Sequence, residues 1–249
     1  MIELFSDPAV WASFLTLTIL EIVLGVDNVI FISIVAQKLP EEQRARARVV
    51  GLGIALLMRV ALLFSIAWIV GLTEPVISPF DFPLSWRDLI LIAGGLFLLY
   101  KAATEIFEEV EGGDLHTAPE EVVKAAFMTV IAQIVVLDLV FSFDSVLTAV
   151  GIAEHIEVMV AAVVIAIGVM MVAAGPISAF VEAHPSTKML ALAFLVMIGM
   201  ALVAEGFHVH VEKGFIYAAM VFAGAVEGLN LWRQKRRIRL AAAADRSAA

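Results

Sequence analysis

Long apolar stretches alternate with short polar segments along the whole of this chain. Seven of the stretches are long enough to cross a hydrocarbon layer of roughly 30 Å as helices rising about 1.5 Å per residue. The predicted spans are residues 10–36, 49–71, 88–106, 124–151, 157–181, 188–208 and 214–232. Prolines and charged residues separate them, as at Pro40 and Pro185. The pattern predicts an all-α integral membrane protein with seven transmembrane helices.

Composition supports a membrane protein. The chain is 62% hydrophobic and 16% charged, whereas soluble domains are about half apolar and a quarter charged. The formal net charge of -9 argues against a nucleic-acid partner. We therefore expect a lipid bilayer as the main surrounding partner.

Basic residues predict the orientation in the bilayer. By the predicted spans, 13 of the 16 lie on one side: Lys38, Arg44, Arg46, Arg48, Lys101, Lys124, Lys188, Arg233, Lys235, Arg236, Arg237, Arg239 and Arg246. The positive-inside rule places this side in the cytoplasm and the N-terminus outside. On this reading residues 1–232 form one transmembrane domain and 233–249 a basic cytoplasmic tail. Lys101 and Glu105, four residues apart, are predicted to form an ion pair at the inner end of the third span.

Two predicted spans each contain a pair of acids six residues apart. The first pair is Glu21 and Asp27, and the second is Asp138 and Asp144. An acidic side chain at the centre of a membrane helix costs roughly 2.5–3.5 kcal/mol on insertion scales. The pattern therefore indicates a functional polar site within the membrane.

The two acid-bearing spans also align with each other. A shift of 117 residues superposes Glu21 on Asp138, Asp27 on Asp144, Asn28 on Ser145 and Gly51 on Gly168. We predict two three-helix repeats, at about 10–106 and 124–208, followed by an extra helix at about 214–232. Because each repeat has an odd number of spans, the two would insert with opposite polarity. Inverted repeats are typical of transporters whose substrate site lies at the midplane.

The six-residue spacing does not suit an unbroken helix that binds one small ligand. Two residues six apart lie about 120° from each other around the axis and about 9 Å along it. We therefore predict broken or distorted helices at 25–28 and 142–145. Glycine and asparagine in the first segment tolerate non-helical backbone, and serines in the second can bond freed carbonyls.

Oxygen atoms dominate the predicted site. Its candidate metal ligands are Glu21, Asp27, Asn28, Asp138, Asp144 and Ser145. Such a set suits a hard cation such as Mg²⁺, Ca²⁺ or Mn²⁺. Arg59, inside the second span, is a candidate charge partner for the acids or an ion pair that serves packing. Glu227 and Asn230 could extend the ion path or line a helix contact.

Several segments resemble the TerC family of integral membrane proteins, within the wider LysE-type transporter grouping. They are Leu20–Asn28, Met58-Arg59, Gly94–Phe97, Asp138–Ser145, Lys213–Tyr217 and Val226–Asn230. The resemblance implies export of Mn²⁺ across a bacterial inner membrane. It also implies that the six candidate metal ligands named above form the binding site. The tellurite resistance associated with the family fits poorly, because four acids would repel an oxyanion.

These patterns together predict a transporter and no enzyme or cofactor, with the divalent cation as substrate and protons as counter-ions. The expected mechanism is proton-coupled alternating access, in which the two halves rock against each other. Exporting two charges against about 100 mV costs roughly 4.6 kcal/mol, which inbound protons can offset. One alternative is a membrane-assembly factor whose acids stabilise the fold. Another is an intramembrane aspartyl protease, which needs two acids about 3 Å apart that share a proton.

Overall fold

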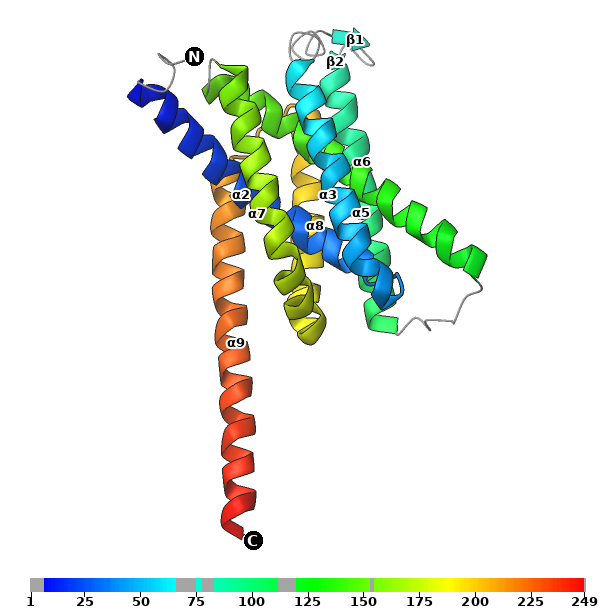
Figure 1. Ribbon diagram of the computed structural model, residues 1–249, viewed down its shortest axis with the longest axis vertical. Coiled ribbons are helices and arrows are strands. Elements are labelled where there is room, and N and C mark those ends of the chain that lie inside the picture. The colour runs from blue at the N-terminus through cyan, green and yellow to red at the C-terminus, as the bar shows by residue number, and fades with distance from the viewer. Residues whose placement is uncertain (1–6, 66–74, 78–82, 112–119, 153–154, 249) are drawn as a thin grey trace. The chain divides into compact units, whose positions relative to one another are not determined.

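The computed structural model describes residues 7–65, 75–77, 83–111, 120–152 and 155–248. Within these ranges the chain is helical, apart from short connections and a small antiparallel pair of strands (Figure 1). The elements are α2 (Pro8–Ala36), α3 (Glu41–Phe64), β1 (Pro75–Ile77), β2 (Leu84–Ser85), α5 (Trp86–Glu111), α6 (Glu120–Ile152), α7 (Ile156–Ala183), α8 (Pro185–Gly206) and α9 (Lys213–Ala248). Each predicted span coincides with one of the seven helices, although residues 66–71 of the second span lie outside the described ranges.

Six helices in the described ranges are long and apolar enough to cross a membrane. They are α2, α3, α5, α7, α8 and the Gly214–Arg237 part of α9. The apolar part of α6, Ala126–Ser142, is shorter. The structure therefore supports an all-helical membrane protein, and the seventh crossing stays a prediction.

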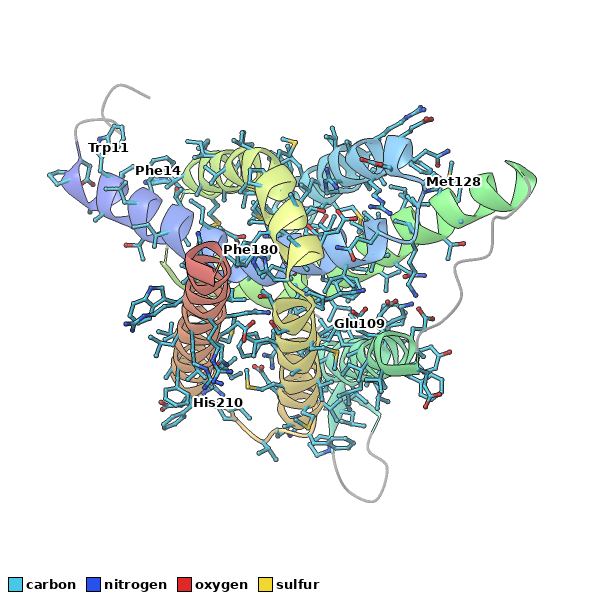
Figure 2. The ribbon with its side chains drawn as sticks, turned by 90° about the horizontal axis from the view of Figure 1, so that it is seen from below. Trp11, Phe14, Glu109, Met128, Phe180 and His210 are labelled. Carbon is cyan, nitrogen blue, oxygen red and sulfur yellow. The ribbon has the colours of Figure 1, made fainter. Side chains whose placement is uncertain are left out.

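The chain divides into two compact units, of which the first ends at Val209. In this unit α2 packs along α7, α3 packs on α6 and α7, and α5 packs along α8. The N-terminal parts of α2 and α6 lie on opposite sides of the unit, as the labels of Trp11 and Met128 show (Figure 2). The two helices therefore run in opposite directions and contact each other where they cross. This reciprocal packing is compatible with the inverted repeat, which itself stays a prediction.

Glycines allow the closest of these helix contacts. A Cβ added to Gly95 of α5 would lie 2.7 Å from the carbonyl oxygen of Gly199 in α8. A Cβ added to Gly199 would lie 3.0 Å from the carbonyl oxygen of Gly95. The two backbones touch here, as small residues permit between membrane helices.

The predicted breaks at 25–28 and 142–145 are wrong, because α2 and α6 are helical through both segments. Gly25 has a packing role instead, since an added Cβ would lie 2.3 Å from Met170 Sδ on α7. Ser142 Oγ donates to the Asp138 carboxylate, one helical turn earlier, rather than to a freed carbonyl. Close helix approach explains Gly25 and side-chain hydrogen bonding explains Ser142, so neither residue requires an unwound helix.

The second unit comprises His210–Ala249 and is built on α9. The helix continues well beyond the predicted end at residue 232. Its extension contains arginine, lysine, leucine and alanine, all good helix formers. Within this unit Phe215 and Phe222 are exposed, so the helix presents an apolar surface.

Candidate cation site at the crossing of α2 and α6

Three charged side chains meet inside the first unit. Arg59 of α3 donates from Nη1 to Glu21 Oε2 of α2. On its other side Arg59 binds Asp138 of α6, with Nη2 2.8 Å and Nε 3.2 Å from Asp138 Oδ1. We call Glu21, Arg59 and Asp138 the buried triad. It joins α2, α3 and α6.

The triad is almost completely shielded from solvent. Glu21, Arg59 and Asp138 are 2%, 3% and 6% exposed. Buried charges are tolerated only when they are paired and hydrogen-bonded, and these three are. With both acids ionised, the triad has a formal charge of -1, because one guanidinium faces two carboxylates. The surplus negative charge favours a further cation or a proton.

The two acids of the triad occupy equivalent positions in the predicted repeat. Arg59 bridges them, and the residue equivalent to Arg59 is Pro176 in α7. A single arginine therefore serves both acids. Arg59 pairs with both acids, as either of its two predicted roles would require, so the choice between charge partner of a cation site and packing ion pair stays a prediction.

Serines on α6 complete the immediate surroundings of Asp138. Ser142 Oγ donates to Asp138 Oδ2 at 2.9 Å, and Ser145 Oγ donates to the carbonyl of Ser142 at 3.3 Å. Both serines are buried. Asp138 thus receives hydrogen bonds from Arg59 and Ser142, which hold its carboxylate in place.

Asn28 carries a buried amide on α2. Glu21 precedes it by seven residues and lies on the same face of the helix. Two residues seven apart on a helix point in nearly the same direction. Asn28 is 6% exposed, and its Oδ1 has no hydrogen-bond partner among the described residues. A buried carbonyl oxygen without a partner is costly, but on the continuous helix α2 Asn28 lies about 10.5 Å along the axis from Glu21. A shared cation therefore stays a prediction for Asn28 as well.

The other predicted ligands are not brought into the triad by what the structure describes. Asp27 and Asp144 lie on α2 and α6, but their side chains are outside the described residues. On these continuous helices each lies six residues, about 9 Å, from the acid that contacts Arg59. Glu227 and Asn230 belong to the second unit. Convergence of four acids therefore stays a prediction.

A second group of ion pairs gathers where α5 ends and α7 meets α8. The peripheral ion pairs are Lys38–Glu105 (2.7 Å), Lys38–Glu108 (2.7 Å), Lys101–Glu105 (3.4 Å), Arg44–Glu182 (2.6 Å) and Lys188–Glu109. Figure 2 marks Glu109 in this group. The Lys101–Glu105 pair confirms its prediction, whereas the acidic partners of the other basic residues were not predicted. Burial alone would lower the pKa of Lys38, but hydrogen bonds and charge from Glu105 and Glu108 raise it.

A third cluster, missed from the sequence, ties the start of α5 to the end of α8. Asp88 accepts hydrogen bonds from the Ser85 backbone N–H at 2.8 Å and from Ser85 Oγ at 2.7 Å. His208 Nε2 lies 3.1 Å from the same carboxylate, and Arg87 pairs with Glu205 at 2.8 Å. Since Ser85 and Asp88 stand three residues apart at a helix start, the capping pattern was the available signal.

Long apolar helices around a buried ionic core define an integral membrane protein with a charged interior site. The chain belongs to the integral membrane protein TerC family, which it matches over residues 6–239. This match confirms the resemblance seen in the sequence motifs.

Relatives of the chain carry matching descriptions. It is 54% identical over 234 residues to the UPF0053 inner membrane protein YgdQ of Escherichia coli K12, covering 93% of this chain and 96% of that protein. It is 51% identical over 231 residues to a UPF0053 protein of Haemophilus influenzae, covering 93% and 97%. It is 50% identical over 237 residues to the UPF0053 inner membrane protein YoaE of Escherichia coli K12, covering 95% of this chain and 46% of that protein. No solved structure matches the chain significantly.

Proposed function

We propose that this protein exports a hard divalent cation, with Mn²⁺ the first candidate, across a bacterial inner membrane. Its ligands would be carboxylate and amide oxygens near the crossing of α2 and α6. One observation carries the proposal: two buried acids on crossing helices, Glu21 and Asp138, share one positive charge, that of Arg59, among the described residues. An interior that holds more negative than positive charge is suited to a cation.

The ligand chemistry supports a hard metal. Glu21, Asp138 and the unpaired Asn28 Oδ1 are all oxygen donors, and the chain has no cysteine. Oxygen donors suit Mn²⁺, Mg²⁺ and Ca²⁺ better than soft or nitrogen-preferring metals. Within this group the choice of Mn²⁺ rests on the family resemblance of the motifs.

Proton coupling addresses the energetic cost of export. Moving two positive charges outward against about 100 mV costs roughly 4.6 kcal/mol. An exchange for two protons carries no net charge and removes that electrical cost. Carboxylates can bind a metal or a proton in turn, so the same acids could serve both steps.

The geometry gives the protease alternative little support at the triad. Glu21 and Asp138 each bind Arg59, whereas a protease dyad shares one proton between two acids. Here a guanidinium occupies the space between the carboxylates. The pair is built to hold a cation.

Purified protein in liposomes tests the proposal. The vesicles contain a Mn²⁺-quenched dye and, in a parallel preparation, a pH dye. Adding Mn²⁺ outside should quench the first dye and shift the second as protons leave the vesicles. The same assay with Ca²⁺ and Mg²⁺ as competitors ranks the substrates.

Two variants make the assay specific. Asp138→Asn should abolish Mn²⁺ flux, because it removes an acid of the site while preserving side-chain shape. Glu182→Gln removes an acid from a peripheral ion pair and should transport like the wild type. Absence of Mn²⁺ flux in folded wild-type protein would reject the transporter, and flux without a pH change would reject only the proton exchange.

A further inference from the structure

We propose that Arg59 is a tethered cation that competes with the metal for Glu21 and Asp138, and that the arriving metal displaces it from both acids. This inference rests on the proposed function and adds a defined competitor for the cation. It makes Arg59 a positioning residue for the two acids and an opponent of metal binding.

The guanidinium contacts both of the carboxylates that would bind the metal ion. Arg59 reaches Glu21 through Nη1 and Asp138 through Nη2 and Nε. An ion bound by both carboxylates would lie between them, where the guanidinium now lies. The two cannot occupy this position together, so binding by both acids requires Arg59 to withdraw.

Arginine is suited to be displaced rather than neutralised. Its guanidinium remains protonated at all relevant pH values, so it cannot leave by losing a proton. It therefore acts as a permanent positive charge on a flexible stem. Only a competing cation, or protonation of the acids, can release it.

The charge balance at the two acids favours the exchange. With Arg59 in place, the two ionised acids and the guanidinium sum to -1. With a divalent ion between the acids instead, the ion and the two carboxylates sum to zero. The displaced guanidinium keeps its positive charge on α3, so it must then pair with another acid or with water, because an uncompensated buried charge is costly.

The predicted repeat gives a separate argument. An arginine whose purpose was to neutralise the acid of each half would be expected in both halves. Pro176 stands where the second arginine would be, and one guanidinium bridges the two equivalent acids. A single cation shared by both halves is the arrangement that the transported ion itself would adopt.

Metal binding to Arg59→Gln tests the inference. Full-length protein in detergent is titrated with Mn²⁺, and free Mn²⁺ is followed by its electron paramagnetic resonance signal. Loss of the competitor should tighten Mn²⁺ binding at least tenfold relative to the wild type. Arg44→Gln removes a peripheral arginine that pairs with Glu182 and should bind Mn²⁺ like the wild type.

Thermal unfolding distinguishes competition with the metal from a purely structural role of Arg59. Arg59→Gln leaves two buried acids without their partner, so it should unfold at a lower temperature than the wild type when metal is absent. Mn²⁺ should raise its unfolding temperature more than that of the wild type, because a ligand stabilises the folded state that binds it. A purely structural arginine would give a loss of stability that Mn²⁺ does not restore.

A double variant provides the matched comparison. Glu21→Gln with Arg59→Gln removes one acid together with the arginine and keeps the formal charge at -1. It should lose the gain in Mn²⁺ affinity seen in Arg59→Gln. Retention of that gain would show that the acids are not the binding partners and would overturn the inference.

The outcomes separate this inference from the proposed function. Mn²⁺ flux in wild-type liposomes, with Arg59→Gln binding Mn²⁺ no tighter than the wild type, overturns the displacement and leaves the transporter standing. Tighter binding by Arg59→Gln without any flux in the wild type supports the displacement and rejects transport. Absence of binding by both proteins overturns both.

Discussion

The buried triad and the peripheral ion pairs use the same chemistry in different surroundings. Each of the three triad residues is 6% exposed or less. Among the peripheral ion pairs the side chains of Lys38, Glu108 and Glu182 are 34%, 54% and 52% exposed, and Glu105, at 4%, is the buried exception. Exposed pairs exchange water for a partner at little net gain. Buried charges cannot exchange a lost partner for water, so removal of one partner leaves the others uncompensated. The comparison teaches that position, rather than the number of ion pairs, decides which charges the fold depends on.

The largest effect on stability is expected at Arg59. Arg59→Gln should lower the free energy of unfolding by about 3–5 kcal/mol in metal-free buffer, since it leaves two buried acids unpaired. Reversible unfolding in mixed detergent micelles measures this change. A loss below 1 kcal/mol would mean that the buried triad is solvated like the peripheral ion pairs, and it would contradict the difference drawn between the two groups.

Replacing the whole triad separates stability from function. The variant Glu21→Met, Arg59→Met, Asp138→Leu should be as stable as the wild type or more stable by about 1–4 kcal/mol, because apolar residues of similar size need no desolvation of charge. It should bind and transport no Mn²⁺. Strong destabilisation of this triple variant would instead assign the charges to the fold and favour the assembly-factor alternative.

Packing should show the same contrast between tight and open sites. Gly95→Ala should lower the free energy of unfolding by about 1–3 kcal/mol, since the added Cβ would overlap the backbone of Gly199. Gly53→Ala on α3 meets nothing within 4 Å and should stabilise the protein by about 0.5–1 kcal/mol through helix propensity. Both changes are followed by the same unfolding assay. Equal effects at the two sites would contradict the close contact of α5 with α8.

A smaller effect is expected at the periphery. Glu182→Gln removes the partner of Arg44, and the pair is half exposed. Its loss should lower the free energy of unfolding by about 0.2–1 kcal/mol. The difference from the wild type should shrink as salt is added, because salt screens exposed charges. A large, salt-independent loss would place this pair with the triad.

The smallest effect concerns the pH dependence of Lys38. Its pKa in the folded protein is raised above the unfolded value of 10.5, so its pairing stabilises the fold below pH 10.5 and is lost as pH rises through the folded value. Compared with Lys38→Met, the wild type should keep a constant advantage of less than about 1 kcal/mol from pH 7 to 10. The advantage should disappear at higher pH. An advantage that grows with pH would contradict the sign of the shift.

The sequence predicted the helices and part of the site for reasons that are local. Apolar length defined the spans, and charged residues within apolar stretches marked Glu21 and Asp138 as members of a buried polar site. The bridge formed by Arg59 could be expected only as a candidate, because it depends on how α3 packs against α6. The role of Gly25 depends on contact with Met170, which is 145 residues away in the chain. Local backbone preferences gave the wrong interpretation of that glycine.

The Gly95–Gly199 contact restricts how such a protein can change shape. Two backbones that touch without side chains between them interlock, so α5 and α8 should move as one rigid body. Yet α5 belongs to the first predicted repeat and α8 to the second. A simple rocking of one repeat against the other would shear this joint apart. If the proposed alternating access occurs, its moving bodies should therefore each combine helices of both predicted repeats, with α5 and α8 in the same body.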